Sequence, residues 1–166
     1  MLVPIDRMLE SSRTADQLQK LIEAAFAETN YPGDTQLVDD NSGYHLECNE
    51  VAAAFRGKHW KEVPLETLRY HSAGIFFLTP EAYRFYLPAY LLAAVLHYDQ
   101  VDTLPDSVVF SLIPPSDARD VEAYRQRVEG FTATQRQVIR CFLEFQKQHH
   151  SQDDALGDLD KALANF

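Results

Sequence analysis

The stretch from residue 75 to residue 96 constrains the fold more than any other part of the chain. It reads IFFLTPEAYRFYLPAYLLAAVL and carries only two charged side chains, Glu81 and Arg84. A helix that is apolar on every face is normally buried, so we expect the rest of the chain to pack around it. Thr79 is a favourable N-cap and Pro80 suits the first helical position, which predicts a helix from Thr79 to about Tyr98.

Pro88 falls inside this predicted central helix. It removes one backbone hydrogen bond and crowds the carbonyl group of Arg84, so we expect a kink or a break there. The uncharged run from Arg84 to His97 is interrupted by this proline and is too short to span a bilayer.

Further segments have helical patterns with clear start and stop signals. Thr14 with Gln17 and Thr132 with Gln135 form capping boxes, and Gly57 and Gly130 are natural helix ends. A last acidic helix, which either docks or stays mobile, could be capped by Ser151. The predicted helices besides the central one cover residues 14–30, 46–56, 64–72 and 117–129, one that starts at 132, and a peripheral one within 150–166.

Residues 108–113 are β-branched and apolar and are followed by two prolines. The segment is compatible with a short strand or with an extended buried segment. A lone strand needs a partner for its backbone groups, and the only candidates are residues 36–38 and 75–78.

Together these patterns predict a mainly α protein. We expect one compact domain over residues 1–166, with six or seven helices around the central apolar helix and at most a short two-stranded β element. Residues 1–13 show no clear period and are compatible with a loose arm. An apolar content of 46% and a charged content of 24% are ordinary for a globular protein and give no sign of disorder.

The formal net charge of −10 limits the partners that the chain can have. It disfavours nucleic acids and anionic membranes, both of which need Lys and Arg on the protein. It is compatible with a basic protein partner, although solubility alone also explains it. Two cysteines, Cys48 and Cys141, make no disulfide framework, and no signal peptide is evident, so we expect a cytoplasmic protein.

Three parts of the chain together resemble an uncharacterised bacterial family, one of those described as a domain of unknown function. The resemblance covers roughly residues 18–146 and implies a small, mainly helical, cytoplasmic bacterial protein. It implies no catalytic or binding residues. The parts are IEAAF at 22–26 with YPG at 31–33, FLTPEAY at 77–83 with YLPAY at 86–90, and FTATQ at 131–135 leading to Phe142 and Leu143.

No motif in the sequence predicts a catalytic residue, a cofactor or a metal site. Asp39, Asn41 and Glu50 have the outer spacing of a calcium loop, but Tyr44 stands where that loop needs glycine. The six histidines lack zinc-ligand spacing. His45 and Cys48 lie one turn apart, but this spacing is not a nucleophile signature.

Tyr83, Tyr86 and Tyr90 are the main candidates for a functional surface. Their spacing of three and four residues puts them on one side of the central helix. They form either a core stripe or one wall of a groove, since tyrosine suits surfaces that are apolar but wet. Trp60 has the same two interpretations. We therefore expect a non-enzymatic protein-interaction domain; the alternative is a small-ligand-binding protein or enzyme with a tyrosine-lined pocket.

Overall fold

The computed structural model describes residues 14–166, and the regular secondary structure of these residues is helical. The mainly α prediction is therefore confirmed. The described part holds eight α-helices and four short 3₁₀ helices. The α-helices are α2 (Ala15–Ala25), α3 (Leu46–Phe55), α4 (Leu65–Tyr70), α5 (Pro80–Leu96), α6 (Leu104–Ser111), α7 (Ala118–Glu129), α8 (Ala133–His150) and α9 (Asp158–Leu163), and the 3₁₀ helices are η1 (Trp60–Glu62), η2 (Ser72–Phe76), η3 (Tyr98–Gln100) and η4 (Ser151–Asp153).

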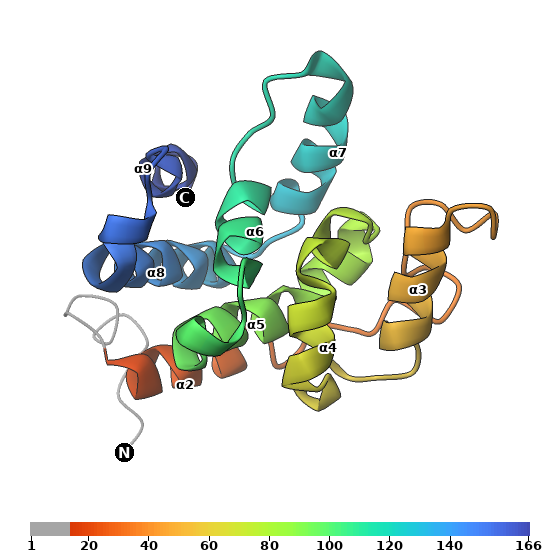
Figure 1. Cartoon of the computed structure of the whole chain (residues 1–166), viewed down its shortest axis with the longest axis horizontal. Coiled ribbons are helices and arrows are strands. Elements are labelled where there is room, and N and C mark those ends of the chain that lie inside the picture. Colours follow the sequence, from red (N-terminus) through yellow and green to blue (C-terminus); the bar gives the residue numbers. More distant parts are fainter. Residues whose placement is uncertain (1–13) are drawn as a thin grey trace.

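Helix α5 is the centre of the core, as its composition predicts. Its first turn is closed by Thr79, whose hydroxyl oxygen accepts a hydrogen bond from the Ala82 amide at 3.1 Å. Twelve of its 17 residues are buried, because α2, α4, α6, α7, α8 and η1 pack around it. Figure 1 shows these helices on different sides of α5. The helix continues through Pro88 without a break.

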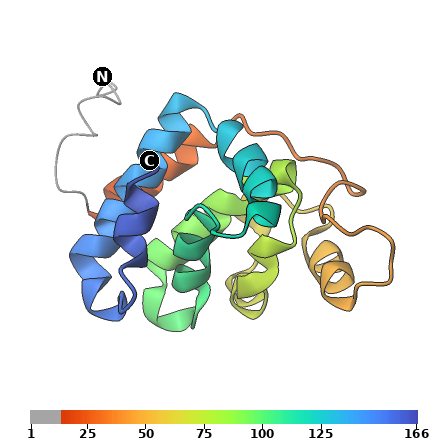
Figure 2. The same ribbon diagram turned by 90° about the horizontal axis from the view of Figure 1, so that it is seen from above.

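Both predicted capping boxes are present, and the second one also holds two helices together. Gln135 in the first turn of α8 accepts a hydrogen bond from the Thr132 amide at 3.0 Å. Its side-chain amide donates to the Ala25 carbonyl at the end of α2, at 3.2 Å. The start of α8 is thereby fixed to the end of α2, and the two helices pack along each other (Figures 1 and 2).

The strand interpretation of residues 108–113 is wrong, because most of the segment belongs to α6. Leu104 and Val108 lie one turn apart on α6 and are fully buried. Packing of this face against α5 outweighs the β propensity of the Val-Val-Phe run. The two candidate strand partners meet each other instead. Val38 and Leu78 form an isolated antiparallel bridge, so the described residues contain no β-strand, which is within the expected limit of at most a short two-stranded β element.

The C-terminal segment docks on the body of the protein. Helix α9 packs against α6 and α8, with Leu159 4% exposed and Ala162 fully buried. Ser151 does not cap this helix, because α9 begins after Gly157. Gly157 adopts the left-handed conformation with a φ of 68°, which glycine tolerates better than other residues. The predicted arm at residues 1–13 lies outside the described residues.

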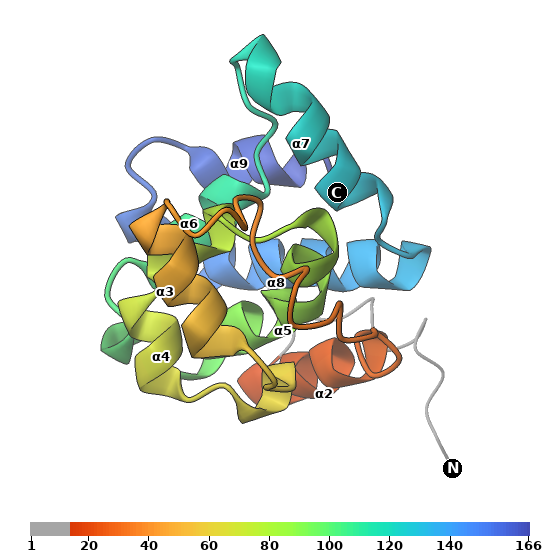
Figure 3. The ribbon, with the colours of Figure 1, turned by 90° about the vertical axis from the view of Figure 1, so that its right-hand side faces the viewer.

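Helix α7 stands out from the body (Figures 1 and 3). Val128 is its buried residue, and the rest of the helix is strongly polar. The Arg84 side chain on α5 holds its end, because the Arg84 Nη1 donates to the carbonyls of Gln126 and Arg127 at 2.7 and 3.2 Å. A cation at the C-terminal end of a helix satisfies free carbonyl groups and interacts favourably with the helix dipole.

Candidate functional site

Tyr83, Tyr86 and Tyr90 all lie in the core, with exposed fractions of 1%, 0% and 0%. The groove-wall interpretation of these residues is therefore wrong, and the core-stripe interpretation is the one that the structure shows. The reason is that helices cover α5 on the tyrosine side as well as on the others.

Each tyrosine hydroxyl has a partner inside the protein. The Tyr83 hydroxyl shares a hydrogen bond of 2.8 Å with the Ser111 hydroxyl on α6. The Tyr86 hydroxyl donates to the carbonyls of Phe55 and Lys58, at 2.9 and 2.8 Å. The Tyr90 hydroxyl donates to the His71 carbonyl at 2.9 Å. Burial raises the pKa of Tyr83 to about 12 and also raises the pKa of Tyr86 and Tyr90, so all three stay neutral near pH 7.

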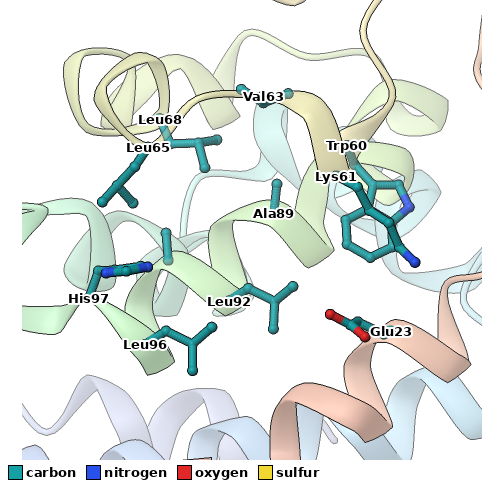
Figure 4. Close-up of a pocket in the computed structure, with 11 residues that line it drawn as sticks. Glu23, Trp60, Lys61, Val63, Leu65, Leu68, Ala89, Leu92, Leu96 and His97 are labelled. Carbon is teal, nitrogen blue, oxygen red and sulfur yellow. The ribbon is translucent and has the colours of Figure 1, made fainter. Parts of the chain in front are cut away.

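Trp60 differs from the three tyrosines in that it lines a hollow in the surface. Its side chain is 2% exposed, and its ring forms one end of a groove between α2, η1, α4 and α5. We call this hollow the Trp60 groove; its volume is about 290 Å³. Figure 4 shows Trp60 at one end and His97 at the other, with Ala89 and Leu92 between them. The lining residues are Glu23, Trp60, Lys61, Val63, Leu65, Leu68, Ala89, Leu92, Ala93, Leu96 and His97.

Local sequence features place the two sides of the groove. On one side, η1 is closed by a capping box in which the His59 Nδ1 accepts from the Lys61 amide and Glu62 accepts from the His59 amide. This box holds Trp60 against α5. On the other side, Ala89 and Ala93 lie one turn apart on α5, and their small side chains leave the space that forms the hollow.

The groove has an apolar floor and a few polar groups. The Trp60 Nε1 and the His97 Nδ1 are buried, and neither has a hydrogen-bond partner within the described residues. The indole N–H is closed off from the groove as well as unpaired among residues 14–166, and a buried donor without a partner costs roughly 1–3 kcal/mol. The Lys61 Nζ lies 5.2 Å from the centroid of the Trp60 ring and is free to move away, since the residue is exposed.

The volume of the groove indicates what it can hold. Pockets for drug-sized ligands span about 300–1,000 Å³ and enclose most of the ligand. At about 290 Å³ the Trp60 groove is at the lower limit, and it is open along one side. A hollow of this size suits one large apolar side chain of a partner, which is how anchor residues bind in protein interfaces.

The other candidate residues have structural roles. The His45 Nδ1 accepts a hydrogen bond from the Cys48 amide at 3.3 Å, so His45 caps α3 and does not activate the thiol. Burial raises the pKa of Cys48, which keeps the thiol protonated at neutral pH. Among residues 14–166, no three His, Cys, Asp or Glu side chains lie close enough to hold a metal ion. In the same range, no helix has the length and hydrophobicity needed to cross a membrane.

No motif or periodicity in the sequence points directly to this site. Trp60 was a candidate on its own, and the other lining residues come from four separate elements that only the fold brings together. One usable signal was the pair Ala89 and Ala93, because small residues one turn apart on an otherwise bulky helix leave a depression.

Comparison with known proteins identifies a family but no function. Residues 14–166 match the family described as "Family of unknown function (DUF6714)". No curated protein matches the chain. No solved structure matches it either.

Proposed function

The chain belongs to DUF6714, a family of unknown function, and we propose that it is a non-enzymatic protein-interaction domain that binds a basic partner through the Trp60 groove. The observation that carries this proposal is the groove itself. It combines partly exposed leucines with the ring of a buried tryptophan. Buried aromatic anchors surrounded by apolar side chains are typical of the energetic centre of protein interfaces.

The apolar part of the contact would come from three leucines. Leu65 on α4 and Leu92 and Leu96 on α5 are partly exposed at the groove, although they also pack against the core. An apolar side chain inserted between them would cover this remaining surface. Burial of a leucine-sized side chain contributes roughly 1.5–3 kcal/mol to binding.

Charge supports a basic partner. The net charge of −10 attracts cations over distances of about 8–10 Å at ordinary salt. Glu23 on α2 lines the groove and would face a Lys or Arg that flanks the inserted side chain. An amphipathic helix with a leucine on one face and lysines beside it has the required chemistry.

As part of the same proposal, the protein works in the cytoplasm, where its buried cysteines stay reduced.

Fluorescence of Trp60 offers a direct test, because it is the only tryptophan in the chain. The probe is a synthetic amphipathic helical peptide made of leucine and lysine, compared with one in which glutamate replaces every lysine. We expect only the lysine peptide to shift the Trp60 emission, and we expect its binding to weaken as salt is added.

Two variants and one control locate the binding. Leu65→Gln and Glu23→Gln should each weaken the lysine peptide by about threefold to tenfold, because they remove an apolar contact and a charge contact. Leu46→Gln is the matched control, since Leu46 is 75% exposed on α3 and does not line the groove. The proposal fails if both peptides bind equally well, or if the control loses as much affinity as the groove variants. Circular dichroism confirms that each variant is folded.

A further inference from the structure

We propose that a second hollow, between α6 and α7, is a binding site for a small aromatic monocarboxylic acid, with Arg127 as the residue that holds the carboxylate. This role is separate from the interaction through the Trp60 groove. The α6–α7 cavity has a volume of about 650 Å³, within the range of about 300–1,000 Å³ for small-molecule sites.

Arg127 on α7 is a largely buried cation with unused capacity for hydrogen bonds. Its side chain is 13% exposed and forms part of the cavity wall. The Nη2 donates to the Phe76 carbonyl at 3.0 Å, while the Nε is buried and has no partner among the described residues. The guanidinium carbon lies 5.4 Å from the centroid of the Tyr83 ring. The face of that ring and one carbonyl group do not neutralise a buried charge.

Asp39 is the carboxylate nearest to this guanidinium, and it is a weak counterion. The Asp39 Oδ2 lies 3.8 Å from the Arg127 Nη2, which is beyond hydrogen-bonding distance. Burial raises the pKa of Asp39 more than Arg127 lowers it. The part of the guanidinium that lines the cavity, beside the Asp39 carboxylate, can pair with a ligand carboxylate in a charge-assisted hydrogen bond. The ligand therefore competes with Asp39 and displaces it from the guanidinium.

The rest of the cavity fits a flat apolar body. Phe76 and Phe110 meet edge to face, with ring centroids 5.9 Å apart, and Phe110 is 60% exposed. Ile113 and Pro114 continue the apolar wall. The Tyr124 hydroxyl already donates to the Leu112 carbonyl at 3.1 Å, so this side chain offers the ligand mainly its ring. An aromatic ring of the ligand can pack edge to face or offset-stacked on these groups, which adds to the affinity beyond the apolar area that it buries.

Charges at the rim favour a monoanion over a dianion. Asp120 and Asp158 line the opening, and Lys161 there is already paired with Asp158 at 3.0 Å. A phosphate group would meet this negative charge with twice the repulsion of a carboxylate. The acidic rim therefore disfavours a dianion at the opening more than a monoanion.

The test uses 3-phenylpropionate as the probe, with 3-phenylpropanamide as its neutral analogue and inorganic phosphate as a second anion. Binding to the whole chain is measured by calorimetry and located by amide chemical shifts. We expect 3-phenylpropionate to bind at least about tenfold more tightly than the amide, because only the acid pairs with the arginine. The shifts should gather on residues 110–127, and Trp60 emission should stay unchanged.

Three variants distinguish binding that depends on Arg127 from binding that depends only on apolar contacts in the cavity. Arg127→Gln should abolish the preference for the acid over the amide. Asp39→Asn should tighten binding of the acid several-fold, because it removes the carboxylate that competes for Arg127. If Arg127→Gln does not fold, the Asp39→Asn variant still tests the proposal. Asp16→Asn makes the same change in charge on exposed α2 and should have no effect. Equal binding of acid and amide, tighter binding of phosphate, no binding at all, or no response to Asp39→Asn would each overturn the proposal.

Discussion

The hydroxyl groups of Tyr83, Tyr86 and Tyr90 tie α5 to three different neighbours. Their partners lie on α6, at the end of α3 and at the end of α4. The spacing of the tyrosines shows that they share a side of the helix, but it cannot show what covers that side. Because α5 is apolar on all sides, its sequence has no polar face that would indicate which side of the helix meets solvent. The burial of these residues therefore depends on distant segments.

Removal of the Tyr86 hydroxyl alone should have a measurable cost. We expect Tyr86→Phe to lower the free energy of unfolding by about 1–3 kcal/mol, since the carbonyls of Phe55 and Lys58 lose their donor in a buried place. Tyr86→Ala should cost more, about 3–5 kcal/mol, because it also leaves a cavity. Urea denaturation followed by circular dichroism measures both. A Phe variant as stable as the parent protein would show that this hydroxyl does not hold α3 to α5.

Helix α6 shows which elements can be predicted from local sequence and which cannot. Helices with a cap and a clear apolar stripe, such as α2 and α8, were predicted close to their observed starts. The segment around Val108 has neither signal: it is short, apolar on most sides and rich in β-branched residues. Its helical state comes from the burial of Leu104 and Val108 against α5, which involves residues far apart in the chain.

The attachment of α7 can be weakened at a single position, Gly130. A Cβ at this position would clash with the Arg84 guanidinium group, so Arg84 would have to move away from the carbonyls of Gln126 and Arg127. The Arg84 side chain is flexible, so the steric cost is small and the loss is that of charged hydrogen bonds, about 1.5–3 kcal/mol each. We expect Gly130→Ala to speed amide hydrogen exchange in α7 while exchange in α8 stays slow.

A double-mutant cycle tests the cause of this effect. On an Arg84→Ala background the bonds to α7 are already lost, so Gly130→Ala should have little further effect on exchange in α7. If the effects of Gly130→Ala and Arg84→Ala on exchange in α7 are instead fully additive, then Gly130→Ala does not act by displacing the Arg84 side chain.

At the scale of the whole molecule, negative charge is concentrated at one edge, where α6 meets the chain that leads into α9. Burial raises the pKa of Asp106 there, and Asp153, Asp158 and Asp154 raise it further. A carboxyl whose pKa is raised in the folded state contributes stability that is present in acid and lost as the pH rises through the folded-state pKa. At neutral pH the charge on Asp106 therefore weakens the fold.

Asp106→Asn should accordingly raise the urea midpoint at neutral pH. The gain should shrink as the pH falls through the raised folded-state pKa and should be lost below about 4, where the carboxyl is protonated in both the folded and the unfolded parent protein. Glu28→Gln serves as the control, since Glu28 is exposed and lies after α2, away from this edge. A gain that does not depend on pH, or an equal gain from Glu28→Gln, would point to a general effect of net charge.

The central claim is that the Trp60 groove is the surface through which this protein meets a partner. Site-specific photo-crosslinking in the native host tests it most directly, with a photoreactive phenylalanine analogue placed at Leu65 in the groove or at Leu46 on α3. We predict that one discrete adduct forms from position 65 and not from position 46, and that Glu23→Gln weakens it. No adduct from position 65, or the same adducts from both positions, would contradict the claim.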